Sequence, residues 1–196
     1  MRFVAGADEA GRGSLAGPLV VAAVCLDMDL LRGRRCAALG MLDDSKRHTA
    51  ERRETLFQAV VESAAQVAVI VVPAAQIDRR GLHRSNLSAL GRALCALDPE
   101  PDVCMTDGFS VPGCARAHRA VVGGDGRSAA IAAASIVAKV SRDRFMRQAD
   151  LRHPGWGFAE HVGYSTPSHR EAIQRDGVSP LHRMSFQSLA YQQLAL

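Results

Sequence analysis

The sequence predicts an α/β fold built around a mixed β-sheet. Short apolar runs of strand length alternate along the chain with longer segments whose apolar residues recur every three to four positions, a pattern typical of strands alternating with helices. The first two apolar runs, residues 3–5 and 19–26, are near enough in the chain to form a hairpin. With 196 residues, of which 47% are hydrophobic, we expect a single domain with a substantial core.

The middle of the chain predicts two helices with a strand between them. Residues 29–41 have no clear periodicity and indicate an irregular connection, after which Thr49 is placed to cap a helix. The apolar face of that helix is predicted from Leu56, Phe57, Val60, Val61 and Ala64. Residues 67–72 are continuously apolar, as expected of a strand covered on both faces. Ser85 is placed to cap the second helix, whose buried stripe is predicted from Leu87, Leu90, Leu94 and Leu97.

The second half of the chain predicts one more strand and one long helix. Residues 103–106 form a short apolar run that ends at Asp107, and open α/β sheets bind ligands just beyond the carboxyl ends of their strands. Residues 127–147 predict a long helix, in which the small residues 132–135 allow close packing on the sheet. From about residue 153 to 196 we expect a C-terminal helical extension that contributes to substrate binding, with Thr166 and Pro167 placed as the N-cap and first residue of a helix.

Composition narrows the class of protein. The formal net charge of +4 suits a polyanionic partner without requiring one. The five cysteines are scattered and odd in number, which argues against a disulfide framework and against a zinc site; they are Cys25, Cys36, Cys95, Cys104 and Cys114. We expect Cys25, Cys95 and Cys104 to be small core residues. No apolar run approaches the roughly 20 residues of a membrane helix, and no signal segment is recognised, so we expect a cytoplasmic protein without membrane contact.

The stretch that organises the function is the acid pair Asp8 and Glu9, which follows the first apolar run. Neighbouring strand residues point to opposite faces, so we expect the backbone to turn at these acids, helped by Gly11 and Gly13. Two close carboxylates raise each other's pKa unless a cation neutralises them. Hard divalent ions with oxygen ligands, Mg²⁺ or Mn²⁺, do so. The simpler alternative is a pair of solvated acids at a strand end.

Two further acids, Asp107 and Asp125, also stand beside glycines. Four carboxylates brought together are able to hold two divalent ions about 3.5–4 Å apart, an arrangement used for phosphodiester cleavage. Spacing alone leaves open whether the four acids meet in space, because the chain contains 20 acidic residues. A second alternative is that Gly11-Arg12-Gly13, which follows a strand, forms the phosphate-binding loop of a nucleotide-binding protein. The Gly-Lys-Ser/Thr ending of such loops is missing here.

Several ordered motifs carry a family resemblance that covers about residues 4 to 186. They are residues 4–13 (VAGADEAGRG), 42–46 (LDDSK), 106–108 (TDG), 124–125 (GD), 132–140 (AAASIVAKV) with 142–144 (RDR), 163–166 (GYST) with His169, and 182–183 (HR) with 185–186 (SF). Together they resemble bacterial ribonuclease HII. The resemblance implies a ribonuclease H-like fold and a metal-dependent endonuclease. Its implied substrates are RNA–DNA hybrids and duplex DNA with embedded ribonucleotides, cut on the 5′ side of the ribonucleotide.

The resemblance also implies roles for individual residues. Asp8, Glu9 and Asp107 resemble the metal-binding acids of the family, and Asp125 resembles its fourth active-site carboxylate. Gly11, Arg12 and Gly13 resemble the motif that reads the 2′-hydroxyl at the RNA–DNA junction, and Tyr164 resembles the tyrosine that stacks on the following deoxyribose. Lys46 and Lys139 are expected to contact the substrate. The implied cofactor is Mn²⁺ or Mg²⁺, and we expect a monomer.

The remaining polar residues receive less specific expectations. Arg142 and Arg144 are candidate phosphate contacts, with a solvated basic face as the alternative, and Asp143 between them is expected to form local salt bridges. His161, His169 and His182 are expected to form hydrogen bonds rather than to bind metal; Trp156 and Phe158 are expected to pack. Ser14, Gly123 and residues 79–86 depart from the family pattern but remove no acid. A non-catalytic homologue would be expected to have lost an acid, and the related ribonuclease HIII would carry an additional amino-terminal domain.

Overall fold

The computed structural model describes residues 2–33, 49–188 and 191, and its centre is a five-stranded mixed sheet. The strands are β1 (Phe3–Ala10), β2 (Leu19–Asp27), β3 (Gln66–Val72), β4 (Val103–Asp107) and β5 (Arg119–Val121), in the spatial order β3-β2-β1-β4-β5. The strand β2 is antiparallel to both β1 and β3, whereas β4 is parallel to both β1 and β5. The predicted mixed sheet and the predicted first hairpin are therefore confirmed.

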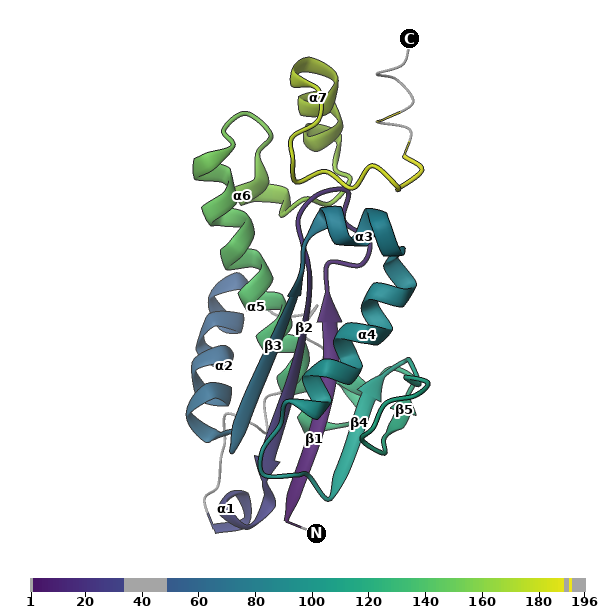
Figure 1. Cartoon of the computed structure of the whole chain (residues 1–196). Coiled ribbons are helices and arrows are strands. Elements are labelled where there is room, and N and C mark those ends of the chain that lie inside the picture. Colours follow the sequence, from purple (N-terminus) through teal and green to yellow (C-terminus); the bar gives the residue numbers. More distant parts are fainter. Residues whose placement is uncertain (1, 34–48, 189–190, 192–196) are drawn as a thin grey trace.

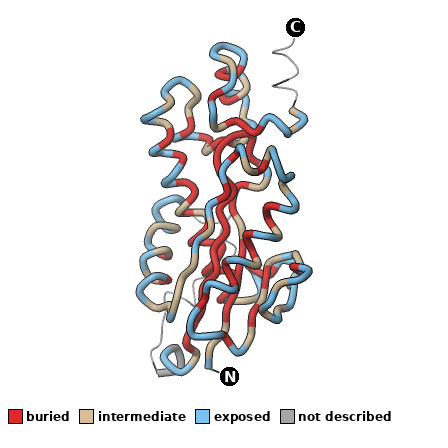
Figure 2. Tube along the Cα trace, viewed as in Figure 1, coloured by how far each residue is buried: buried red, intermediate tan, exposed pale blue. Residues whose placement is uncertain are grey.

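Helices cover both faces of this sheet (Figure 1). The helices of the described residues are α1 (Met28–Gly33), α2 (Ala50–Ser63), α3 (Ala74–Arg80), α4 (Leu82–Cys95), α5 (Ala129–Arg152), α6 (Phe158–His161) and α7 (Pro167–Asp176), with a 3₁₀ turn at Gly124–Gly126. The helices α3 and α4 pack with one face of the sheet, and α2 and α5 pack with the other. The buried residues accordingly form a continuous band along the central strands, as Figure 2 shows.

The helix α5 lies unusually close to β1, and glycine makes this possible. A Cβ added at Gly6 would lie 2.3 Å from the backbone carbon of Ala130, which no real side chain tolerates. Alanines fill most of the α5 surface at this contact, and Ala130, Ala133, Ala134 and Ala138 are all buried. The predicted small-residue face of the long helix is therefore confirmed, and the close packing sets α5 beside the strand that carries Asp8 and Glu9.

The predicted helix caps are partly confirmed. Thr49 Oγ1 accepts the backbone N–H of Arg52 at 3.2 Å, and Thr166 Oγ1 accepts that of His169 at 3.2 Å. Ser85 was the wrong cap, because α4 begins at Leu82 after Gly81, which has a positive φ of 80°. The short preceding helix α3 was not predicted, since seven residues carry too little periodicity to be recognised.

Four predictions of burial or connection were wrong. The strand β3 lies at the edge of the sheet, and Val69 and Val71 are 40% and 51% exposed. Val61 is likewise 48% exposed, so the apolar face of α2 is narrower than predicted. Cys95 is exposed at the end of α4, and residues 28–33 form α1 where an irregular connection was expected. A continuous valine run indicates a strand but does not distinguish a central strand from an edge.

Candidate active site

The acids Asp8 and Glu9 lie inside the strand β1, which runs without interruption to Ala10. The prediction that the backbone turns at the acids was therefore wrong, and the turn follows at Gly11, whose φ is 88°. Strand alternation is kept: Asp8 interacts with Ser135 on α5, and Glu9 lies by Asn86 on α4. Both carboxylates nevertheless reach one cavity, because it lies at the end of the sheet and is open to both faces.

This cavity has a volume of about 240 Å³. It is lined by Asp8, Glu9, Ala10, Gly11, Arg12, Gly13, Asp107, Ser135, Lys139 and Tyr164. Residues from the two ends of the chain and from its middle thus meet at the carboxyl ends of β1 and β4, where α/β sheets bind ligands. Of the candidate site residues that the structure describes, all except Asp125 line it; Lys46 lies outside the described residues.

The cavity is strongly acidic on one side. Burial, together with the neighbouring charges of Glu9 and Asp107, raises the pKa of Asp8 to about 7, against a hydrogen bond from Ser135. Burial also raises the pKa of Glu9, while the guanidinium of Arg12, with Nη1 3.6 Å from Glu9 Oε1, lowers it. The charged forms of these carboxylates are therefore destabilised where they stand, and a cation in the cavity would stabilise them.

A hydrogen bond links the side chain of Asp107 to the turn that carries Asp125. Asp107 is the last residue of β4, and its Oδ1 accepts the backbone N–H of Gly124 at 2.7 Å. This bond fixes the 3₁₀ turn that carries Asp125, a residue only 9% exposed. Asp125 Oδ1 accepts the N–H of Gly126 at 3.1 Å. The fourth acid is thus tied to the third, although it is not part of the cavity lining.

The donor set suits a hard divalent cation. Every acidic group in the cavity offers oxygen, and oxygen donors favour Mg²⁺ and Mn²⁺ over soft metals. Within the described residues, Glu9 Oε2 is buried without a hydrogen-bond partner, a position that a cation would satisfy. In the described part of the chain, no three His, Cys, Asp or Glu side chains are grouped so that they could hold a metal ion as they stand. We conclude that the residues fit a divalent ion and would have to draw together around it.

The Gly11-Arg12-Gly13 loop forms the opposite side of the cavity. The guanidinium of Arg12 lies 4.4 Å from the ring centroid of Phe109 as well as beside Glu9. Gly11 is required for two reasons, since its φ is positive and an added Cβ would lie 1.9 Å from Nε of Arg142. Gly13 is exposed, and an added Cβ there would meet nothing within 4 Å. The loop therefore presents backbone, not bulky side chains, to a ligand.

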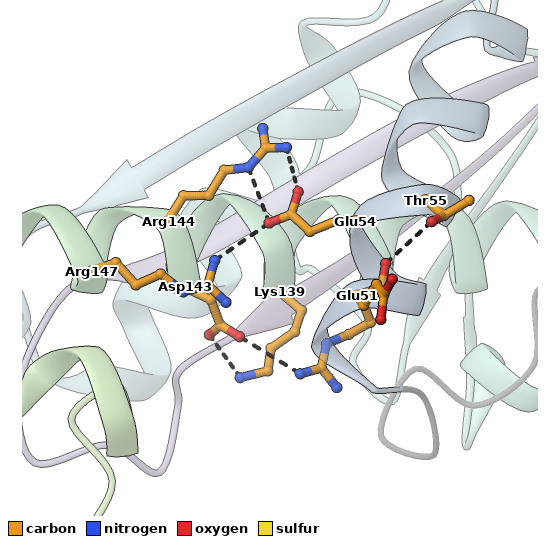
Figure 3. Close-up of polar contacts among 8 residues, drawn as sticks. Glu51, Glu54, Thr55, Lys139, Asp143, Arg144 and Arg147 are labelled. Carbon is orange, nitrogen blue, oxygen red and sulfur yellow. Dashed lines mark hydrogen bonds and ion pairs between the residues drawn. The ribbon is translucent and has the colours of Figure 1, made fainter.

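Lys139 reaches the cavity from α5 and is held by Asp143. Lys139 Nζ lies 2.7 Å from Asp143 Oδ1, and Arg53 Nη2 of α2 lies 4.0 Å from Asp143 Oδ2 (Figure 3). The ammonium also lies 5.6 Å from the ring centroid of Tyr164. The salt-bridge role expected for Asp143 is confirmed, but its partners are Lys139 and Arg53 and not the adjacent arginines.

The two candidate phosphate arginines have structural partners. Arg142 is fully buried, and its Nε and Nη2 donate to the carbonyl oxygens of Pro18 and Ala16 at 3.0 and 3.1 Å. Its assignment as a phosphate contact is wrong, because solvent and substrate do not reach it. Arg144 lies on the outer side of α5, where it pairs with Glu54 of α2 (Figure 3).

Two residues that lie beside the acids were not predicted as site residues from the sequence. Ser135 lines the cavity and bonds Asp8, although it had been noted only as part of a motif. Asn86 is fully buried and lies near enough to Glu9 to favour its charged form. Its amide atoms nevertheless make no hydrogen bond of ordinary length to any residue that the structure describes. A polar residue in an apolar helical stripe was the signal available for Asn86.

The histidines of the extension form hydrogen bonds, as expected, and they do so within one buried cluster that was not predicted. His169 Nε2 lies 3.1 Å from His182 Nε2, and His169 stacks on His161 with ring centroids 4.1 Å apart. Phe158 is fully buried against them, and Trp156 packs beside it, so both aromatic residues pack as expected. Lys46 and Cys36 lie outside the described residues. Among the helices that the structure describes, none is long and apolar enough to cross a membrane.

Comparisons with known proteins place this geometry in a family. The sequence profile of ribonuclease HII matches residues 5–189. The chain is 50% identical over 183 residues to a ribonuclease HII of Rhodococcus erythropolis, covering 93% of this chain and 79% of that one. It is 48% identical over 186 residues to a ribonuclease HII of Geobacillus kaustophilus, covering 95% and 68%. The crystal structure of ribonuclease H2 from Pyrococcus horikoshii is similar, with a TM-score of 0.80, 26% identity, and 98% and 96% of the two chains covered. The chain therefore belongs to the ribonuclease HII family of metal-dependent endonucleases.

Proposed function

We propose that this endonuclease hydrolyses the phosphodiester bond on the 5′ side of ribonucleotides, in RNA–DNA hybrids and in duplex DNA with embedded ribonucleotides. Its cellular role would be the removal of misincorporated ribonucleotides and RNA primers. One observation carries the proposal: Asp8, Glu9 and Asp107 share a single cavity with the Gly11–Gly13 loop, in which Gly13 is exposed. The acids that would hold a divalent ion and the loop that would contact a sugar thus line the same cavity.

In this proposal Asp8, Glu9 and Asp107 hold the divalent ion, Mn²⁺ or Mg²⁺, and Asp125 completes the acidic group from the adjoining turn. When bound, the ion supplies charge neutralisation and lowers the pKa of a water molecule at the scissile phosphate. Hydrolysis adds that water across the P–O3′ bond and leaves a 3′-hydroxyl and a 5′-phosphate. Lys139, fixed by Asp143 at 2.7 Å, contributes a positive charge to a substrate phosphate. Lys46 is proposed as a further substrate contact from its motif alone.

Recognition of the ribonucleotide is assigned to the Gly11–Gly13 loop. A 2′-hydroxyl is both a donor and an acceptor, and the backbone of an exposed glycine loop offers both complements within reach of a sugar. Tyr164, on the same cavity, would pack on the next sugar and favour deoxyribose there. Since Tyr164 belongs to the C-terminal extension, that extension would contribute to substrate binding.

The experiment uses three duplexes of one sequence: all DNA, DNA with a single ribonucleotide, and an RNA–DNA hybrid. With Mg²⁺ or Mn²⁺ we expect the second duplex to be cut once, on the 5′ side of the ribonucleotide, and the hybrid to be cut at several positions. The all-DNA duplex should remain intact. Equal cutting of all three duplexes, or cutting on the 3′ side of the ribonucleotide, would refute the proposal.

A further inference from the structure

Two buried arginines hold the connection between β1 and β2, residues 11–18, to which the Gly11–Gly13 loop belongs. Arg183, from the C-terminal extension, donates from Nη1 to the carbonyl oxygen of Arg12 at 3.1 Å and from Nε to that of Gly17 at 2.9 Å. Arg142 of α5 donates to the carbonyl oxygens of Ala16 and Pro18. Four carbonyl groups of one loop are therefore directed into the protein by two guanidinium groups.

Both guanidinium groups are buried at considerable electrostatic cost. Arg142 and Arg183 are fully buried, and within the described residues neither has a carboxylate at ion-pair distance. Burial, together with the charge of Arg142, lowers the pKa of Arg183 to about 9. A buried charge without an ionic partner destabilises a fold. Its presence at this position suggests that the loop geometry it maintains has a function.

The hydrogen bond from Arg183 to the Arg12 carbonyl also sets the direction of the next N–H in the loop, that of Gly13. In a trans peptide the C=O and the following N–H point in opposite directions. The carbonyl of Arg12 points inward to Arg183, so the N–H of Gly13 points outward. Gly13 lines the cavity and is exposed. The outward N–H is therefore available to a ligand in the cavity.

We propose that Arg183 is a positioning residue for substrate recognition: by fixing the Arg12 carbonyl, it aims the N–H of Gly13 at the 2′-hydroxyl of the ribonucleotide. This inference rests on the proposed function, because it assumes that a ribose lies in the cavity. It assigns the C-terminal extension a second contribution besides Tyr164. The guanidinium fork is necessary here, since a lysine ammonium cannot span the carbonyls of Arg12 and Gly17 with the same planar geometry.

The test separates recognition of the 2′-hydroxyl from grip on the duplex backbone. With Mg²⁺ present, the KM is measured for the duplex with one ribonucleotide, and the inhibition constant is measured for the identical all-DNA duplex as competitor. We expect Arg183→Lys to raise the KM about tenfold, as for loss of one well-formed hydrogen bond, and to leave the inhibition constant unchanged. The matched control is Arg175→Lys on the surface of the extension, where Arg175 pairs with Asp176; both constants should stay as in the wild type.

A second pair of variants tests whether Arg183 acts through Gly13. Gly13→Pro removes the N–H. Gly13→Pro should raise the KM as Arg183→Lys does, and the double variant should be no worse than either single variant. If Arg183→Lys does not fold, as judged by thermal unfolding, Arg183→Gln takes its place and retains one amide donor.

The outcomes distinguish the inference from the proposed function. If the wild type does not prefer the ribonucleotide duplex, the proposed function fails. If the wild type does prefer it and a folded Arg183 variant retains the full preference, only the positioning role fails. Equal weakening of both duplexes, or additive effects of the Arg183 and Gly13 substitutions, would likewise overturn the positioning role.

Discussion

Asp107 Oδ1 accepts the backbone N–H of Gly124 at 2.7 Å, and this bond joins the end of β4 to the turn that carries Asp125. The two acids stand 18 positions apart in the chain, yet this bond holds the Asp107 side chain against the residue that precedes Asp125. The acidic side of the cavity is therefore an assembly of neighbouring parts: β1 supplies Asp8 and Glu9, and β4 supplies Asp107, while the turn beyond β5 carries Asp125 outside the lining.

Asp107→Asn tests the role of the third acid in catalysis. The amide keeps the shape of the side chain and can still accept from Gly124, but it cannot neutralise a divalent ion. We expect turnover to fall by at least about a hundredfold, as is usual when charge stabilisation at a reacting centre is lost, with duplex binding largely kept. Single-turnover cleavage and equilibrium binding measure the two effects. Glu62→Gln on the exposed face of α2 is the matched control, and near-normal turnover of Asp107→Asn would remove Asp107 from the metal site.

Asp8→Asn should stabilise the protein without metal while abolishing activity. Burial and the charges of Glu9 and Asp107 raise the pKa of Asp8 to about 7 in the folded state, from 3.8. The folded state then binds more protons than the unfolded state between these values, so the free energy of unfolding falls as pH rises from about 4 to 7. At pH 8 in EDTA, urea unfolding should show Asp8→Asn more stable by about 2–4 kcal/mol. An unchanged or lower stability would mean that Asp8 is not under charge strain.

Lys139→Gln tests the proposed phosphate contact. Removing one phosphate contact should weaken binding of all duplexes alike and should reduce the slope of log K against log salt concentration by about 0.9. The two slopes are measured by fluorescence anisotropy between low and moderate salt. A selective loss for one type of duplex, with an unchanged slope, would contradict a phosphate contact and point instead to the packing of Lys139 on Tyr164.

The histidine cluster predicts a loss of stability in acid. Burial lowers the pKa of His169 and of His182 to about 4, so the unfolded state takes up protons below about pH 6.5 and the folded state does not until about pH 4. The free energy of unfolding should therefore fall as pH falls through this window, by about 2 kcal/mol for each histidine between pH 7 and pH 5. Chemical unfolding across the window measures this decline. In His182→Asn the free energy of unfolding should fall less steeply with pH. An equally steep decline in that variant would exclude His169 and His182 as the cause of the decline.

Much of the fold was predictable because its signals are local. The periodicity of α2 and α5, the caps Thr49 and Thr166, and the apolar strands β2 and β4 each depend on residues close in sequence. The predictions that failed concerned a strand's position in the assembled sheet or an element too short to show a periodicity. The valine run of β3 gave no sign of an edge position, and the seven residues of α3 gave too weak a pattern to be recognised as a helix.

The candidate site was predictable in its residues but not in its geometry. The motifs named nearly all of the cavity lining, yet the route of the backbone through Asp8 and Glu9 was wrong. A turn was expected so that both acids would face one side. The strand instead continues, and the cavity receives both acids because it lies at the end of the sheet. Arg142 was misassigned for a related reason, since sequence does not show that its guanidinium serves the Ala16 and Pro18 carbonyls.

The central claim is that carboxylates from β1 and β4 form one site for a divalent cation. Crystals soaked in Mn²⁺ and measured at the manganese absorption edge test it most directly, because the anomalous signal locates the ion independently of the protein coordinates. We expect a peak within coordination distance of Asp8, Glu9 and Asp107, and no such peak in crystals of Asp107→Asn. A peak elsewhere, or no peak at this cavity in the wild type at saturating Mn²⁺, would contradict it.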